Sequence, residues 1–266
     1  MSTTEVLEVG HCHTVHEIMQ QRHLSPRFQP IVNLQTGSID GYEGLIRGPS
    51  KSPVEMPGEL FSQAAREGLS VDLELAAART CVDAFTQHQC EGKLYLNFSA
   101  LALHRTTLEL GDPLAFLCDS VLTADRVVIE LTEQSEILSL PLFLEVVEAI
   151  RATGATLALD DYGTGNASMS LWLQLMPGVV KIDRLFVDGI STDPLKFAAV
   201  TAMIGFAKES GTELIAEGIE NTTDLAVLRD LGIDRGQGYL FGRPEARPIV
   251  ADEITRALHT ARGRLF

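Results

Sequence analysis

Short apolar runs alternate along the chain with longer segments in which apolar residues recur every three or four positions. The short runs have the length and β-branched content of buried strands, and they cover Arg27–Val32, Tyr42–Arg47, Lys93–Phe98, Arg126–Leu131, Thr156–Asp160, Val179–Ile182, Glu213–Ala216 and Gly238–Phe241. The longer segments have the period of amphipathic helices, and they cover Gly58–Glu67, Asp72–Gln87, Pro113–Leu122, Leu142–Thr153, Pro194–Glu209 and Thr223–Leu231. This alternation predicts an α/β fold whose strands close as a TIM-like (β/α)8 barrel.

The start of this barrel is expected to be irregular. The first two runs are joined by Asn33–Gly41, which is too short for a crossover helix, so we expect an antiparallel first strand. An open doubly wound sheet is the alternative, but it normally has a glycine-rich phosphate turn after its first strand, and Pro30-Ile31-Val32-Asn33 has no glycine. We expect one barrel domain over residues 24–262, preceded by a lead-in segment or helix over residues 1–23.

Composition and charge narrow the class of protein. Hydrophobic residues make up 45% of the chain and charged residues 21%, as in ordinary globular proteins. The net charge of −15 disfavours general nucleic-acid binding, because a polyanion would be repelled. The sequence lacks an apolar run of the roughly 18 residues that span a bilayer, a basic signal-peptide start, and any CxxC pairing of its cysteines. We therefore expect a cytoplasmic protein without membrane contact from this chain.

Polar residues stand at the carboxyl ends of the predicted strands, where the chemistry of such barrels is concentrated. These residues are Glu43, Asn97, Glu130, Asp160, Asp161, Lys181, Glu217 and, at the opening of the last run, Gln237. Carboxylates that converge from several strands would repel one another unless a cation lies between them. Carboxylate and amide oxygens are hard ligands that suit Mg²⁺ or Mn²⁺. None of the seven histidines lies at a predicted strand end, which argues against zinc or imidazole chemistry.

The adjacent pair Asp160-Asp161 indicates a site for two ions. One carboxylate can bridge two metals while its neighbour serves the second, an arrangement that activates water against a phosphodiester. Lys181 could hold the attacking water or neutralise developing negative charge, although a purely structural partner for surplus acids is the alternative. The glycines of Tyr162-Gly163-Thr164-Gly165-Asn166 predict a loop over these ions. The pattern favours a metal-dependent phosphodiesterase.

The same residues match a family pattern in order along the chain. Glu43-Gly44-Leu45-Ile46-Arg47 resembles the EAL motif, and Phe28-Gln29-Pro30-Ile31 resembles the stretch that precedes it. The later matches are Asn97-Phe98-Ser99, Glu130-Leu131-Thr132-Glu133, Asp160-Asp161-Tyr162-Gly163-Thr164-Gly165, Lys181-Ile182-Asp183, Glu217-Gly218-Ile219-Glu220 and Gln237-Gly238-Tyr239. Each tetrapeptide is weak evidence, but the ordered set over roughly residues 24–245 is specific. The chain resembles the EAL-domain phosphodiesterases.

This resemblance implies a bacterial second-messenger enzyme that hydrolyses cyclic di-GMP to linear 5′-pGpG. It implies two bound metal ions, Mg²⁺ or Mn²⁺, and it implies a homodimer. It implies metal ligands at Glu43, Asn97, Glu130, Asp160, Asp161 and Glu217. It implies catalytic roles for Lys181 and Glu217, and for Glu133 as the anchor of the Gly-Thr-Gly loop. It implies substrate contacts or support at Gln29, Leu45, Arg47, Asp183 and Gln237. The planar fork of Arg47 suits a phosphate.

Three positions depart from the family pattern. Gly44 replaces the usual Ala, Tyr162 replaces the common Phe, and Asn166 stands where an aromatic residue is usual. Since every expected metal ligand is present, we expect an active enzyme rather than the alternative, a non-catalytic cyclic di-GMP receptor. A glycoside hydrolase is a further alternative, because paired carboxylates on a barrel also serve that chemistry. A single Trp and four Tyr offer few surfaces for sugar stacking.

Overall fold

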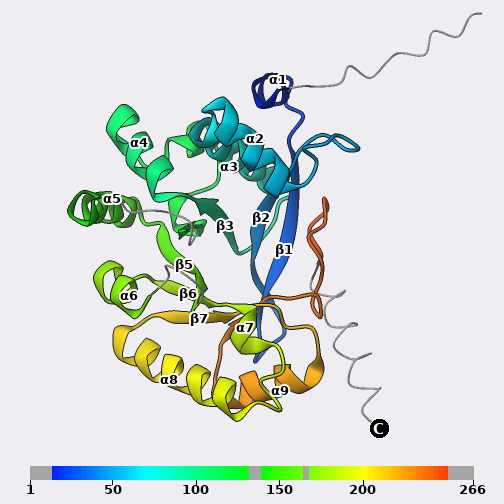
Figure 1. The fold of residues 1–266 in the computed structure, drawn as a ribbon, viewed down its shortest axis with the longest axis vertical. Coiled ribbons are helices and arrows are strands. Elements are labelled where there is room, and N and C mark those ends of the chain that lie inside the picture. The colour runs from blue at the N-terminus through cyan, green and yellow to red at the C-terminus, as the bar shows by residue number, and fades with distance from the viewer. Residues whose placement is uncertain (1–13, 132–138, 164–167, 251–266) are drawn as a thin grey trace, which may run out of the picture.

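The chain forms a closed barrel of eight strands surrounded by helices (Figure 1). The structure is a computed structural model and describes residues 14–131, 139–163 and 168–250. The strands are β1 (Ser25–Asn33), β2 (Ile39–Arg47), β3 (Lys93–Phe98), β4 (Val127–Leu131), β5 (Thr156–Tyr162), β6 (Val179–Ile182), β7 (Glu213–Ala216) and β8 (Arg235–Gly236). They follow one another around the barrel in chain order, which confirms the predicted barrel.

Strand direction confirms the irregular start. β1 pairs with β2 in antiparallel register, with Phe28 opposite Gly44, and also pairs antiparallel with β8. All other neighbouring strands are parallel. The carboxyl ends of β2 to β8 therefore meet at one mouth of the barrel, together with the amino-terminal half of β1.

The helices within the described ranges are α1 (Val15–Gln20), α2 (Pro57–Glu67), α3 (Ser70–Gln87), α4 (Ala100–Leu110), α5 (Leu140–Thr153), α6 (Met169–Leu175), α7 (Arg184–Val187), α8 (Pro194–Ser210) and α9 (Thr222–Leu231). Helices α4, α8 and α9 begin where the side chains of Ser99, Asp193 and Asn221 accept backbone N–H groups. They end at glycines in the left-handed conformation, Gly111, Gly211 and Gly232. These residues are the usual start and stop signals of helices.

Two predicted elements are wrong. The eighth strand is Arg235–Gly236 and not Gly238–Phe241, so Gln237 follows this strand instead of opening it. Residues 238–241 form a turn because Gly238 approaches Ile219 so closely that a Cβ there would overlap its backbone. The predicted helix Pro113–Leu122 is a 3-10 turn over Ala115–Leu117 followed by irregular chain, with Asp119 at a φ of 66°.

Helix α1 packs onto the outside of the barrel ahead of the first strand. Val15 and Ile18 are buried in the main hydrophobic core, and the backbone N–H of Val15 donates to both carboxylate oxygens of Glu67 at the end of α2. The lead-in residues from 14 onward thus share the core of the barrel. No helix in the described part of the chain is long and apolar enough to cross a bilayer.

Candidate active site

A layer of apolar side chains fills the middle of the barrel, and its residues show which positions nearer the mouth also point inward. This apolar layer consists of Ile31, Tyr95, Val128, Ala158, Val179 and Ile215. Side chains alternate along a strand, so the residues two positions closer to the mouth also point inward. Those residues are Gln29, Asn97, Glu130, Asp160, Lys181 and Glu217. Period-two alternation therefore brings polar groups from six elements into a second layer at the mouth.

Lys181 lies at the centre of this polar layer. Its Nζ is 2.9 Å from a carboxylate oxygen of Glu130, 3.0 Å from Asp160, 2.9 Å from Glu217 and 3.5 Å from Glu43. The Lys181 side chain is 1% exposed. One buried ammonium group thus contacts four carboxylates, which come from β2, β4, β5 and the chain directly after β7.

Glu43 is fixed by amide groups on its other side. Asn97 Nδ2 donates to Glu43 Oε1 at 2.9 Å, and Gln237 Nε2 donates to Glu43 Oε2 at 2.6 Å and to Gln29 Oε1 at 2.9 Å. Gln29 Nε2 in turn donates to the carbonyl of Gly242. These bonds join β1, β2, β3 and the chain after β8 into one network, so the orientation of the Glu43 carboxylate is preset.

A β-bulge brings the two adjacent aspartates to the same mouth. Regular alternation would turn Asp160 and Asp161 to opposite faces of the sheet, but the pairing of β5 with β6 shifts register between Leu159 and Tyr162. Asp161 has a φ of 50°, which is unusual for a residue other than glycine. As a result, carboxylate oxygens of Asp160, Asp161 and Glu217 lie within 4.8 Å of one another. Strained backbone of this kind is concentrated at functional sites.

Two effects shift the pKa values of the glutamates around Lys181: burial raises them, and the positive charge of Lys181 lowers them. Burial raises the pKa of Glu130 well above its usual range and raises the pKa of Glu217 to about 8. Burial would also raise the pKa of Glu43, but Lys181 and the amides of Gln237 and Asn97 outweigh it, so that pKa is lowered. Burial would lower the pKa of Lys181, but the surrounding carboxylates raise it well above its usual value. The single positive charge of Lys181 therefore does not balance the charges of the carboxylates around it.

The residues present fit divalent cations. Four carboxylates contact the single ammonium group of Lys181, so one positive charge faces four negative charges when all are ionised, and the carboxylate of Asp161 lies beside those of Asp160 and Glu217. Glu130 Oε1 has the ammonium group of Lys181 at 2.9 Å, and Glu130 Oε2 has no hydrogen-bond partner among the described residues. Buried polar atoms without donors cost stability unless an unseen partner reaches them. All the candidate donors are hard oxygen ligands, as Mg²⁺ and Mn²⁺ require.

The remaining sequence candidates lie around this centre. Leu45 and Arg47 follow Glu43 at two-residue steps along β2 and are half-buried. Asp183 follows β6 directly, and its side chain accepts the N–H of Leu185 at 2.7 Å. The hydroxyl of Tyr162 lies 3.9 Å from the sulfur of Met169. Glu133 and Asn166 lie outside the described residues.

One supporting residue was absent from the sequence prediction. Glu74 on α3 accepts the N–H of Ser99 at 2.7 Å and its hydroxyl at 2.9 Å, and so fixes the chain two residues after Asn97. Burial raises the pKa of Glu74. The signal in the sequence is a single acid within the apolar run Leu73-Glu74-Leu75-Ala76-Ala77-Ala78.

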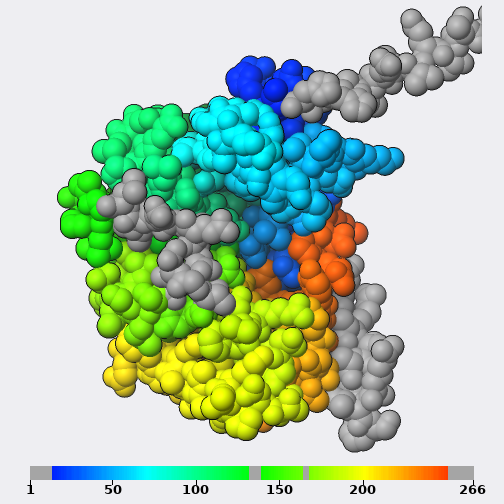
Figure 2. Space-filling model, viewed as in Figure 1, coloured from blue at the N-terminus to red at the C-terminus, as the bar shows by residue number. Residues whose placement is uncertain are grey.

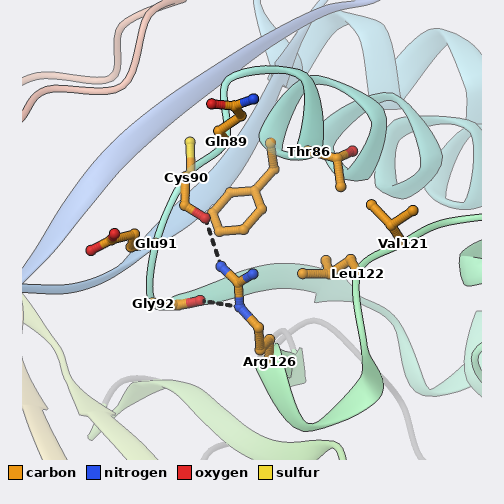
Figure 3. A pocket seen from close by; sticks show the side chains of 9 residues that line it. Thr86, Gln89, Cys90, Glu91, Gly92, Val121, Leu122 and Arg126 are labelled. Atoms are coloured by element: carbon orange, nitrogen blue, oxygen red, sulfur yellow. Dashed lines mark hydrogen bonds between the residues drawn. The ribbon is translucent and has the colours of Figure 1, made fainter.

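The mouth opens on the face of the molecule that carries α7. In the space-filling view this face is hollowed between segments coloured cyan, yellow-green and orange, and the blue residues of the first strands are visible inside (Figure 2). A different hollow, of about 470 Å³, lies near the amino ends of β3 and β4 (Figure 3). There the guanidinium of Arg126 donates to the carbonyls of Cys90 and Gly92 and lies over the ring of Phe85. None of the candidate site residues lines that hollow.

Comparisons with known proteins agree with this geometry. A family model described as EAL domain matches residues 14–244. MucR of Pseudomonas aeruginosa, a bifunctional diguanylate cyclase/cyclic di-GMP phosphodiesterase, is 27% identical over 87% of this chain and 34% of its own length. NbdA of the same organism, a cyclic di-GMP phosphodiesterase, is 27% identical over 91% of this chain and 31% of its own length.

Solved structures show the same fold. BlrP1 of Klebsiella pneumoniae, in a manganese/cy-diGMP complex at pH 9.0, matches with a TM-score of 0.76 and 28% identity over 84% of this chain and 56% of that chain. The chain spans about a third of the length of the curated relatives it matches. Since the family match extends across the whole barrel, from α1 to the turn beyond β8, the chain belongs to the EAL-domain family.

Proposed function

We propose that this chain is a phosphodiesterase that hydrolyses cyclic di-GMP to linear 5′-pGpG with the help of two divalent cations. The observation that carries this proposal is the buried cluster around Lys181, in which four carboxylates share one ammonium group and Glu130 Oε2 has no hydrogen-bond partner among the described residues. Membership of a family that contains cyclic di-GMP phosphodiesterases supports the same substrate. The manganese/cy-diGMP complex of BlrP1 supports a divalent metal.

The proposed metal ligands form two sets, one for each ion. Glu43, Asn97, Glu130 and Asp160 would hold the first ion, and Asp160, Asp161 and Glu217 would hold the second, with Mg²⁺ or Mn²⁺ as the metal. When bound, the ions supply Lewis acidity against the phosphodiester and make water a nucleophile at neutral pH. The bulge after Leu159 presets the two aspartates for this task, and the amides of Asn97 and Gln237 hold Glu43 in one orientation.

Lys181 serves the reaction as a buried cation. Its Nζ lies 2.9 Å from a Glu217 oxygen and 3.0 Å from an Asp160 oxygen, so it reaches the place where these two ligand sets meet. There it can hold the attacking water by a hydrogen bond and offset the negative charge that develops on the phosphate. The surrounding carboxylates raise the pKa of Lys181 in the metal-free protein, so its ammonium group is charged there. We also propose a catalytic role for Glu217, as a ligand of the second ion. Glu133 is proposed to anchor the loop that follows Gly163.

Substrate contacts are proposed for the rim of the mouth. Arg47 can grip a phosphate with its planar fork, and Leu45 offers an apolar surface on the same face of β2. Gln29, Gln237 and Asp183 offer hydrogen-bonding groups close to the polar layer. The strongly acidic chain would repel a dianionic nucleotide without the cations, so we propose that binding also depends on metal.

A homodimer is proposed as well. Helix α6 presents large apolar side chains to solvent at its outer surface, with Leu173 59% exposed and Met176, which follows the helix, 61% exposed. A second copy of the chain would cover such side chains. Sedimentation analysis of wild type and Leu173→Glu tests this: a dimer that the substitution splits supports it, and a monomeric wild type contradicts it.

The experiment that separates an enzyme from a receptor measures binding and turnover on one preparation. Cyclic di-GMP is incubated with the protein in Mg²⁺, in Mn²⁺ and in chelator, and the nucleotides are resolved by chromatography while binding is measured by calorimetry. Formation of pGpG that requires metal supports the proposal. Tight binding of intact nucleotide with no pGpG in either metal would establish the receptor instead.

A further inference from the structure

The short helix α7 lies between the two loops that carry the proposed ligands of the second ion. β6 stands between β5 and β7 in the barrel, and α7 follows β6 after the single residue Asp183. On one side lies the loop that begins at Gly163, directly after Asp161 and Tyr162 at the end of β5, and on the other side lies the loop after β7, which begins with Glu217 and Gly218. The topology therefore places α7 at the point where these loops approach each other (Figure 1).

Each of the two loops contacts α7 through a glycine. Gly163 has a φ of 104°, and a Cβ added there would clash with Cε2 of Phe186 and lie 2.8 Å from its Cζ. Gly218 has a φ of 67°, and a Cβ added there would lie 2.5 Å from Cγ and 2.7 Å from Cβ of Arg184. Gly163 thus approaches Phe186, and Gly218 approaches Arg184, more closely than a residue with a Cβ atom could.

The helix that makes these contacts is itself firmly held. Asp183 caps its start, since its side chain accepts the N–H of Leu185 and its own N–H donates to the carbonyl of Tyr162. Val187 is fully buried in the main hydrophobic core. The guanidinium of Arg184 forms an ion pair with Glu220 at 2.8 Å. A fixed body of this kind can set the separation of the loops on either side.

We propose that α7 is a spacer that sets the distance between the carboxylates of Asp161 and Glu217. Phe186 and the aliphatic stem of Arg184 are its two contact surfaces, and they act as positioning residues for the second ion. This inference rests on the proposed function, because it concerns the ligands of that ion. Without either contact surface, the adjoining loop gains freedom, and the ligand set that now lies within 4.8 Å loosens.

The first ion provides an internal reference. Three of its four proposed ligands, Glu43, Asn97 and Glu130, lie on β2, β3 and β4, away from α7, and only the shared ligand Asp160 lies next to Asp161. Loss of an outer residue that orients metal ligands typically weakens metal affinity by about 10–100-fold. Truncation of Phe186 should therefore weaken binding of the second Mn²⁺ by about that factor and weaken binding of the first Mn²⁺ less.

The variants separate packing from charge and from general damage to the helix. Phe186→Ala and Arg184→Ala remove the two contact surfaces. Arg184→Met keeps the stem that packs on Gly218 but loses the ion pair with Glu220. Leu185→Ala is the matched control, because Leu185 lies on the same helix with 57% of its surface exposed. For each variant, binding of Mn²⁺ alone is measured by calorimetry and by paramagnetic resonance of the free ion.

The expected result is loss of second-site affinity in Phe186→Ala and Arg184→Ala, with Arg184→Met and Leu185→Ala like wild type. Equal weakening of both sites, or an unchanged second site in Phe186→Ala, would overturn the spacer while the two-ion enzyme stands. Arg184→Met behaving like Arg184→Ala would overturn the packing role of the stem. A wild-type protein that binds fewer than two Mn²⁺ would overturn the spacer and the two-ion site together.

Discussion

Replacing Lys181 with methionine should destabilise the metal-free protein much more than the metal-loaded protein. Within the described residues, Lys181 is the cation that contacts Glu130, Asp160, Glu217 and Glu43, at 2.9–3.5 Å. Methionine keeps most of the length and apolar volume of the lysine stem but carries no charge. The substitution therefore removes the ion pairs with little change in packing.

The magnitude follows from burial. Removing one partner of a buried ion pair costs about 3–5 kcal/mol, because the other charge is left uncompensated. For a domain of roughly this size, 1 kcal/mol corresponds to about 2–4 °C in Tm, so the metal-free variant should melt about 6–20 °C below wild type. Divalent cations would pair the same carboxylates, so with metal bound the loss should be less than half of this value.

Thermal unfolding in chelator and in saturating Mn²⁺ measures both losses. Lys208→Met is the matched control, because Lys208 is exposed on α8 and its loss should leave Tm within about 1–2 °C of wild type in both buffers. An equal drop for Lys181→Met in the two buffers would refute the reasoning, since it would mean that metal does not reach the carboxylates that Lys181 holds. The absence of a drop in chelator would refute the structural role of the ion pairs.

Two further substitutions test local features of the fold. A Cβ on Gly44 would lie 3.2 Å from Sγ of Cys81, so Gly44→Ala should cost less stability in a Cys81→Ala background, which lacks that sulfur, with a coupling of about 0.5–3 kcal/mol in a double-mutant cycle; strict additivity would contradict this. Asp224 accepts the N–H groups of Gly189 and Ser191, so Asp224→Asn should cost about 1–3 kcal/mol at neutral pH in urea unfolding. Burial would raise the pKa of Asp224, but these N–H groups outweigh it and lower that pKa. The carboxylate therefore contributes stability above about pH 4, and the gap between wild type and variant should close as the pH falls through the lowered pKa; a gap that persists in acid would contradict this.

The sequence predicts strands where an apolar run is mostly buried and bounded by turns. The bounds of β3, β6 and β7 match the prediction for this reason. β8 was misplaced because only Arg235 and Gly236 pair, while the apolar run after them turns back onto Ile219. Helix α4 was missed because Leu101, Leu108 and Leu110 are exposed, which blurs its apolar face. Its cap Ser99 and its terminal glycine would have marked it.

The candidate site could be predicted because strand periodicity fixes which residues face the mouth. Glu130 and Lys181 each stand two positions beyond a buried apolar residue on a short strand, and such positions converge in any closed barrel. The bulge at Asp160-Asp161 is a register shift that no hydrophobic pattern encodes. The contacts of α7 with Gly163 and Gly218 depend on three separate segments meeting in space, so sequence spacing alone could not reveal them.

The most direct test of the account follows cyclic di-GMP by chromatography with wild type and Glu43→Gln, in Mn²⁺ and in chelator. Glu43→Gln keeps the shape of the side chain while removing the charge that Asn97, Gln237 and Lys181 orient. We predict that wild type forms pGpG in Mn²⁺ only, and that Glu43→Gln forms none above background. Formation of pGpG in chelator, full activity of Glu43→Gln, or intact nucleotide under every condition would contradict it.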